Sequence, residues 1–96
     1  MPNPVSLQSL AEYVANNLRG ANDYHQEIID TYKQIIAVLE TVKPEHDSEQ
    51  LRFVLNKVNN LPNYYDLKSE LSAAKFVLED LTAELKRLKE GDTNAH

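Results

Sequence analysis

Three histidines are the side chains best suited to acid–base catalysis or metal binding in this sequence, namely His25, His46 and His96. No two of them lie three or four residues apart, so no pair can offer two imidazoles to a zinc ion from one helix face. His25 borders an apolar stripe, where we expect it to expose one nitrogen, and His46 falls between predicted helices. A histidine that acts as a base or a ligand needs partner side chains, and none is spaced to reach these three. We therefore predict neither a catalytic histidine nor a metal site.

Acidic side chains gather late in the chain, at Glu79, Asp80 and Glu84. Paired carboxylates can transfer protons or hold two metal ions in a helical bundle, but such a bundle site also needs Glu-x-x-His at inward positions, which is absent. The three lie off the apolar seam of the last helix, so we predict a solvated charged face. The two glycines are too far apart for a phosphate-binding loop, and no serine has a Gly-x-Ser-x-Gly context. We predict that the protein is not an enzyme and holds no cofactor.

The composition narrows the classes of partner. The 96 residues carry 10 basic and 15 acidic side chains, a net charge of −5, which argues against nucleic acid because its binding needs clustered Lys and Arg. The absence of Cys excludes disulfides and thiolate metal sites. No apolar run approaches the ~18 residues of a membrane span, and the first residues lack the basic and apolar regions of a signal peptide. We expect a cytoplasmic protein without a membrane span.

Apolar residues recur at spacings of three and four along most of the chain, which predicts helices within a single domain. We expect an N-terminal arm over residues 1–5, a helical bundle over 6–90 and a disordered tail over 91–96. The helices of the bundle are predicted near residues 6–19, 23–43, 48–61 and 63–90. Predicted helix caps are Ser6, the pair Asp23 and Gln26, and the pair Asp47 and Gln50, while Pro44 ends the second helix and Gly91 the last.

Gly20 raises an alternative for the first two helices. Arg19 in a last turn and a glycine suited to the left-handed C′ position favour a helix end. However, every seventh residue from Leu7 to Val42 is apolar, as one unbroken helix would require. That helix would be about 55 Å long at ~1.5 Å per residue, which is long for a domain of this size. We therefore predict a break near residues 20–22, with a three-helix fold whose long first helix bends near Gly20 as the alternative.

The strongest pattern is an apolar seam in the last predicted helix, with strict spacings of three and four. It comprises Tyr64, Leu67, Leu71, Ala74, Leu78, Leu81, Leu85 and Leu88. Extended backward through Pro62, the seam would miss the apolar set of the preceding helix, Leu51, Val54, Leu55, Val58 and Leu61. The two faces differ by roughly 100° or more, at ~100° per residue. We therefore predict that the chain reverses near residues 59–63 and does not merely kink.

The predicted fold is an all-α antiparallel four-helix bundle with a long last helix. That helix, at roughly 40 Å for ~1.5 Å per residue, outruns the third, so something must cover Leu81, Leu85 and Leu88. The first two helices can do so, or a second chain can. The seam is thus open to two interpretations, an internal core face or the seam of a dimer.

A few apolar residues fall outside these stripes and are candidates for binding a protein partner, because exposed aromatics are typical interface anchors. We rank Phe53 first and Tyr65 second. Phe76, Val77 and Tyr13 complete the set.

The sequence therefore favours a non-enzymatic module that binds a protein partner through the side of the bundle bearing Phe53 and Phe76. A second hypothesis is a self-assembling structural dimer through the 64–88 seam. A third is an inhibitor, immunity protein or antitoxin that neutralises a basic partner, an analogy at the level of fold alone. It draws on the first 48 residues, whose three basic and seven acidic side chains would attract such a partner.

Overall fold

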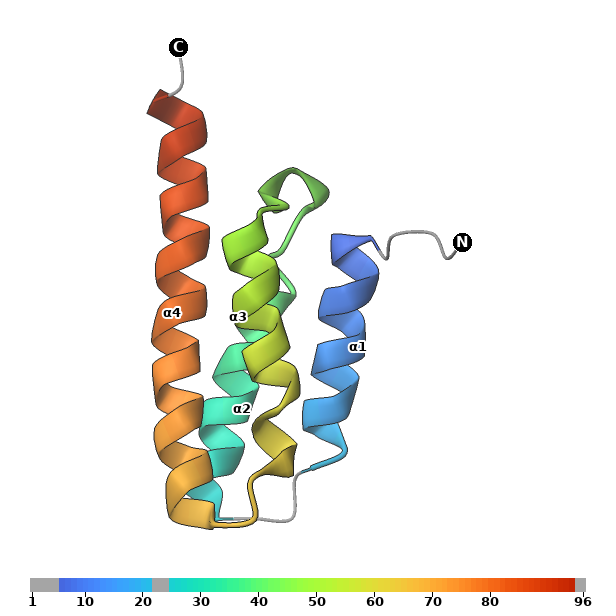
Figure 1. Ribbon diagram of the computed structural model, residues 1–96, viewed down its shortest axis with the longest axis vertical. Helices are drawn as coiled ribbons and strands as arrows, with labels where there is room; N and C mark the ends of the chain where they lie inside the picture. Colours follow the sequence, from blue (N-terminus) through green and yellow to red (C-terminus); the bar gives the residue numbers. More distant parts are fainter. Residues whose placement is uncertain (1–5, 22–24, 95–96) are drawn as a thin grey trace.

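The protein is an all-helical bundle in which each long helix runs antiparallel to the one before it (Figure 1). The computed structural model describes residues 6–21 and 25–94, with residues 91–94 described by their backbone alone. The long helices are α1 (Leu7–Arg19), α2 (Gln26–Leu39), α3 (Glu49–Asn59) and α4 (Leu67–Asn94), and two short 3-10 helices are η1 (Pro44–His46) and η2 (Leu61–Asn63). The predicted four-helix bundle with a long last helix is confirmed, and the three-helix alternative is wrong. The predicted arm over residues 1–5 lies outside the described residues.

Helix α1 begins where the sequence predicts, and it ends without the positive φ that glycine adopts more readily than other residues. The Ser6 hydroxyl accepts a hydrogen bond from the Ser9 N–H at 3.1 Å and caps the helix. Gly20 follows the last residue with φ −74° and ψ −7°, in the ordinary right-handed region. The expected left-handed glycine is therefore wrong, although the expected break after Arg19 is confirmed.

Helix α2 is shorter at its C-terminus than its apolar pattern predicts. It ends at Leu39, and a tight turn follows. In this turn the Thr41 hydroxyl and N–H both donate to the Val38 carbonyl, at 2.7 and 2.9 Å. Lys43 is extended, as expected for a residue that precedes proline. At the other end His25 occupies the N-cap position without a side-chain bond, and Asp23 lies outside the described residues.

The cap of α3 is Ser48 and not the predicted Asp47. The Ser48 hydroxyl accepts from the Leu51 N–H at 3.0 Å, whereas Asp47 is drawn into a two-pronged contact with Arg52, at 2.6 and 2.9 Å. Hydrogen bonding to Arg52 lowers the pKa of Asp47 and raises that of Arg52. The inward residues of this helix are the predicted ones, Leu51, Val54, Leu55 and Val58, followed by Leu61.

The predicted reversal is confirmed, because η2 turns the chain so that α4 packs back against α3 (Figure 1). Helix α4 starts at Leu67, later than predicted, after the Asp66 carboxylate has accepted bonds from the Ser69 N–H and hydroxyl. Tyr64 is thus part of the turn. The helix also continues through Gly91 to Asn94, so Gly91 does not end it, and the first four residues of the predicted tail are helical.

The core lies between α1 and α2 on one side and α3 and α4 on the other. Helix α2 packs against both α1 and α4. Along the far part of α4, Leu81 and Leu85 are buried and Leu88 is half-buried, and η1 packs against the same helix. The chain itself therefore covers these leucines. None of the helices in the described ranges is long and apolar enough to cross a membrane.

Candidate functional site

Four aromatic side chains are exposed on one side of the bundle, on α3, α4 and the turn that joins them. Phe53 is 54% exposed, Phe76 69% and Tyr65 100%, and Tyr64 beside them is also exposed. Val77 is not exposed as expected, because it is buried, at 5%, and packs in the core. It nevertheless lines a hollow between α3 and α4, and its contact with a partner stays a prediction. The structure thus brings together Phe53, Tyr65 and Phe76, and it adds Tyr64.

A pair of opposite charges lies between the two phenylalanines. Lys57 on α3 is 3.9 Å from the Asp80 carboxylate on α4, and its ammonium also sits 4.6 Å from the centre of the Phe53 ring. Phe53 lies four residues before Lys57, and Phe76 lies four residues before Asp80. Residues four apart share a helix face, so each helix presents a phenylalanine and a charge to the same side.

Two shallow hollows follow this side of the molecule. One of about 340 Å³ lies between α3 and α4 and is lined in part by Lys57, Phe76 and Asp80. The other, of about 460 Å³, lies at the turn and is lined in part by Tyr65 and Asp66. Asn60 and Tyr64 line both, so the hollows are adjacent. We call this region the aromatic surface and define it as Phe53, Lys57, Asn60, Tyr64, Tyr65, Phe76 and Asp80.

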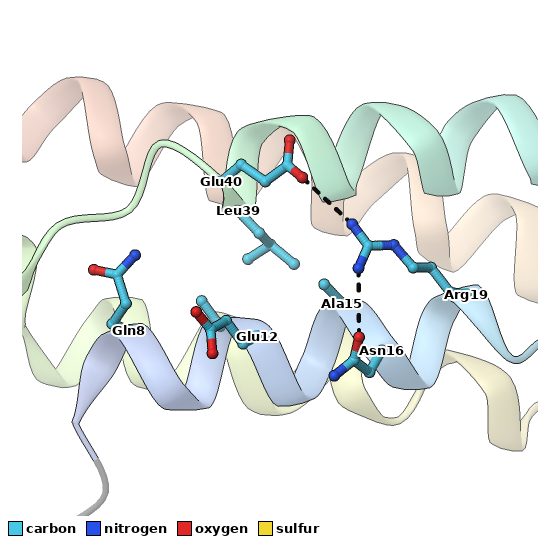
Figure 2. Close-up of a pocket in the computed structure, with 8 residues that line it drawn as sticks. Gln8, Glu12, Ala15, Asn16, Arg19, Leu39 and Glu40 are labelled. Carbon is cyan, nitrogen blue, oxygen red and sulfur yellow. Dashed lines mark hydrogen bonds and ion pairs between the residues drawn. The ribbon is translucent and has the colours of Figure 1, made fainter.

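Tyr13 is exposed but lies on α1, which packs against α2 and α3, and it lines neither hollow. A separate groove of about 370 Å³ runs between α1 and α2, and Figure 2 shows Leu39 at its centre with polar side chains around it. Arg19 pairs with Glu40 across this groove at 3.3 Å and also donates to Asn16. Glu12 makes no ion pair to any residue that the structure describes.

The acidic cluster of α4 is not the uniformly solvated face that its sequence predicts. Glu79 and Asp80 are exposed, but Glu84 is buried. It accepts hydrogen bonds from Arg87 Nε at 3.0 Å and from the Ser48 hydroxyl at 3.2 Å. Hydrogen bonding to Arg87 holds the pKa of Glu84 below its ordinary value, against the opposing effect of burial. Glu84 therefore joins the cap of α3 to α4, which is a structural task.

A second buried carboxyl was not foreseen from the sequence. Glu70 on α4 has no exposed surface, and its Oε2 accepts a hydrogen bond from the equally buried hydroxyl of Tyr32 on α2. Its other oxygen, Oε1, is buried and has no hydrogen-bond partner. A signal for both buried glutamates exists in the spacing, because Glu70, Val77 and Glu84 are seven residues apart and share one helix face.

The two histidines that the structure describes lie in different environments. His46 is buried, which its place in a predicted loop did not indicate, and its Nδ1 accepts a hydrogen bond from the Lys43 N–H at 3.2 Å. His25 is exposed at the start of α2, and His96 lies outside the described residues. Across residues 6–21 and 25–94, no group of three potential metal ligands is placed to hold an ion.

Comparison with known proteins gives no match among family models, curated proteins or solved structures. The aromatic surface therefore has to be interpreted from its own geometry.

Proposed function

We propose that this protein is a non-enzymatic interaction module that binds a protein partner through the aromatic surface. One observation carries the proposal: among the residues whose side chains the structure describes, four of the five exposed large hydrophobics gather on one side of the bundle. Exposed apolar groups scattered singly are ordinary on protein surfaces, whereas a contiguous set marks an interaction site.

The residue types also suit a protein partner. Binding hot spots are enriched in aromatic side chains surrounded by polar groups that exclude water. Here Lys57 lies over the ring of Phe53 and pairs with Asp80, and Phe76 lines the α3–α4 hollow together with Asn60 and these two charges. The two buried carboxyls support a non-enzymatic role, because Glu84 is held by Arg87 and Ser48 and Glu70 by Tyr32, without reaching the aromatic surface.

The test is recovery of partners from a native extract on immobilised protein, with the wild type and two variants compared side by side. The double variant Phe53→Asp/Phe76→Asp places charges in the aromatic surface, and Tyr13→Asp places one on another exposed aromatic as a matched control. We expect the wild type and the control to retain the same proteins and the double variant to lose them. Equal recovery by the double variant, with circular dichroism showing an intact fold, contradicts the proposal.

The acidic first half supports a second candidate, an inhibitor, immunity protein or antitoxin that binds a basic partner. The observation in its favour is Glu12, whose carboxylate stands at the α1–α2 groove without an ion pair to the described residues (Figure 2). Binding there would be electrostatic and would weaken strongly with salt. Capture that is lost at high salt and by Glu12→Lys, but not by the phenylalanine substitutions, favours this candidate over the first.

Two further parts of the proposal follow from the same fold. A dimer through the 64–88 seam is the weaker self-assembly model, because α2 and α3 already cover most of that seam within the chain. We also propose a cytoplasmic location, which cell fractionation with an antibody to the native protein tests directly.

A further inference from the structure

The aromatic surface has an approximate twofold pattern of its own. Helices α3 and α4 are antiparallel neighbours (Figure 1), and each carries a phenylalanine four residues before a charge. The charges, Lys57 and Asp80, face each other at the centre at 3.9 Å. Because the helices run in opposite directions, Phe53 and Phe76 lie at diagonally opposite corners around that pair.

The other two corners carry small or polar side chains. Three residues beyond Lys57 on α3 is Asn60, and three residues beyond Asp80 on α4 is Ala83, and both are exposed. If a second copy is rotated by half a turn about an axis parallel to the helices, its two phenylalanines lie over these two corners of the first copy. The same rotation places Lys57 of each copy opposite Asp80 of the other, which is the reciprocal contact that an isologous interface requires.

The charges on this side favour such a contact in a protein of net charge −5. Three ion pairs neutralise charges around α3 and α4. They join Lys57 to Asp80, Arg52 to Asp47 and Arg87 to Glu84. The excess of carboxylates lies in the first 48 residues, so two copies that met through α1 and α2 would repel each other. The aromatic surface is the side on which two copies can meet without that repulsion.

The exposed area also reaches the size that a dimer needs. At ~150–250 Å² for a whole aromatic side chain, the exposed parts of the four aromatics together offer on the order of 500 Å². Two copies would thus bury on the order of 1,000 Å², the lower limit for a specific interface. A dimer of that size is weak and exchanges readily.

We propose that the occupant of the aromatic surface is a second copy of this chain, in a symmetric dimer in which Lys57 of each copy pairs with Asp80 of the other. The proposal rests on the function proposed above and names its partner.

Sedimentation equilibrium of the purified full chain tests it. The wild type and Tyr13→Asp should approach twice the 11.0 kDa chain mass as concentration rises. Phe53→Asp should raise the dissociation constant about a hundredfold, since a loss of about tenfold at each copy occurs twice in a symmetric dimer. The matched pair Lys57→Asp and Asp80→Lys gives the sharper readout. Each variant alone brings like charges together and stays monomeric, whereas an equimolar mixture of the two restores both pairs and dimerises.

A wild type that stays monomeric overturns the inference, as does a dimer that survives Phe53→Asp or a charge-reversed mixture that fails to associate. These failures are distinguishable from failure of the proposed function. A monomer whose capture of another protein depends on Phe53 and Phe76 overturns only the dimer. Capture that ignores both phenylalanines overturns the function itself.

Discussion

Removing the hydroxyl of Tyr32 should destabilise the fold, and replacing Glu70 as well should restore it. Both side chains are completely buried, and the Tyr32 hydroxyl is the hydrogen-bond donor that the structure gives to the Glu70 carboxyl. In Tyr32→Phe both carboxyl oxygens lack a partner in a place that water does not reach. Leaving a buried polar group without its hydrogen-bond partner costs ~1–3 kcal/mol, so we expect a loss of about 2 kcal/mol.

The double variant Tyr32→Phe/Glu70→Met removes the carboxyl together with its donor. Methionine keeps an unbranched shape and fills irregular core space. Replacing both members of a buried polar pair by apolar groups is often neutral or stabilising, whereas breaking the pair is costly. We expect the double variant to return to within about 1 kcal/mol of the wild type or to exceed it. The orphaned Oε1 of Glu70 adds to this gain, because it is lost as well.

Thermal denaturation followed by circular dichroism gives the measurement. A domain of this size shifts its Tm by ~4–8 °C per kcal/mol, so Tyr32→Phe should melt roughly 8–16 °C below the wild type. Tyr13→Phe removes the same hydroxyl from an exposed tyrosine and should change stability by less than ~0.5 kcal/mol. A Tyr32→Phe protein as stable as the wild type, or a double variant less stable than Tyr32→Phe, refutes the reasoning.

Three further predictions concern other features of the fold. Gly20→Ala should stabilise by ~0.4–1 kcal/mol in urea unfolding, because φ is negative there and the added Cβ meets only carbonyl oxygens at 3.7 Å; a destabilised variant contradicts this. Ser48→Ala removes both the cap and a bond to Glu84 and should cost about 1–3 kcal/mol, more than the simple cap loss in Ser6→Ala. The pKa of Glu84 is lowered in the folded state, so its contribution to stability is complete above its ordinary pKa and is lost as pH falls through the lowered value. Arg87→Gln should therefore flatten the acid side of the stability–pH curve, and an unchanged acid limb counts against this role of Arg87.

The sequence predicts α3 and the reversal after it because the local signals agree there. Leu51, Val54, Leu55 and Val58 share one helix face, and the structure buries all four. Pro62 interrupts the pattern at the point where the phase of the next helix changes. Where the apolar periodicity and the helix-ending residues agree, the local sequence is enough to predict the position of the helix and of the turn.

The phase of α4 could not be predicted, because two of its inward positions hold glutamate. Residues 70, 77 and 84 form a stripe beside the leucine seam, and the structure turns the helix so that all three are buried. A pattern that counts only apolar residues places Glu70 and Glu84 on the solvent-exposed face. Because Val77 shares that face, the same pattern also predicts that Val77 is exposed. Their burial depends on donors from other elements, Tyr32 on α2 and Ser48 at the start of α3, as well as Arg87.

The sequence predicts which residues form the candidate surface, but it does not predict how they are arranged in space. Phe53 falls off the apolar stripe of its helix, so its exposure follows from the helical period alone. That Phe53 and Phe76 lie around one ion pair depends on how α3 and α4 are rotated against each other, which no local pattern records. For the same reason Tyr13 was grouped with them, although α1 carries it elsewhere.

The direction of the four helices has a practical consequence for anyone handling this protein. The start of α1 and the end of α4 lie toward the same end of the bundle, and η2, which Tyr64 and Tyr65 follow in the sequence, lies at the opposite end (Figure 1). A bead, fluorophore or sensor chip coupled at either terminus therefore holds the molecule by one pole and leaves the tyrosine turn facing the bulk solution.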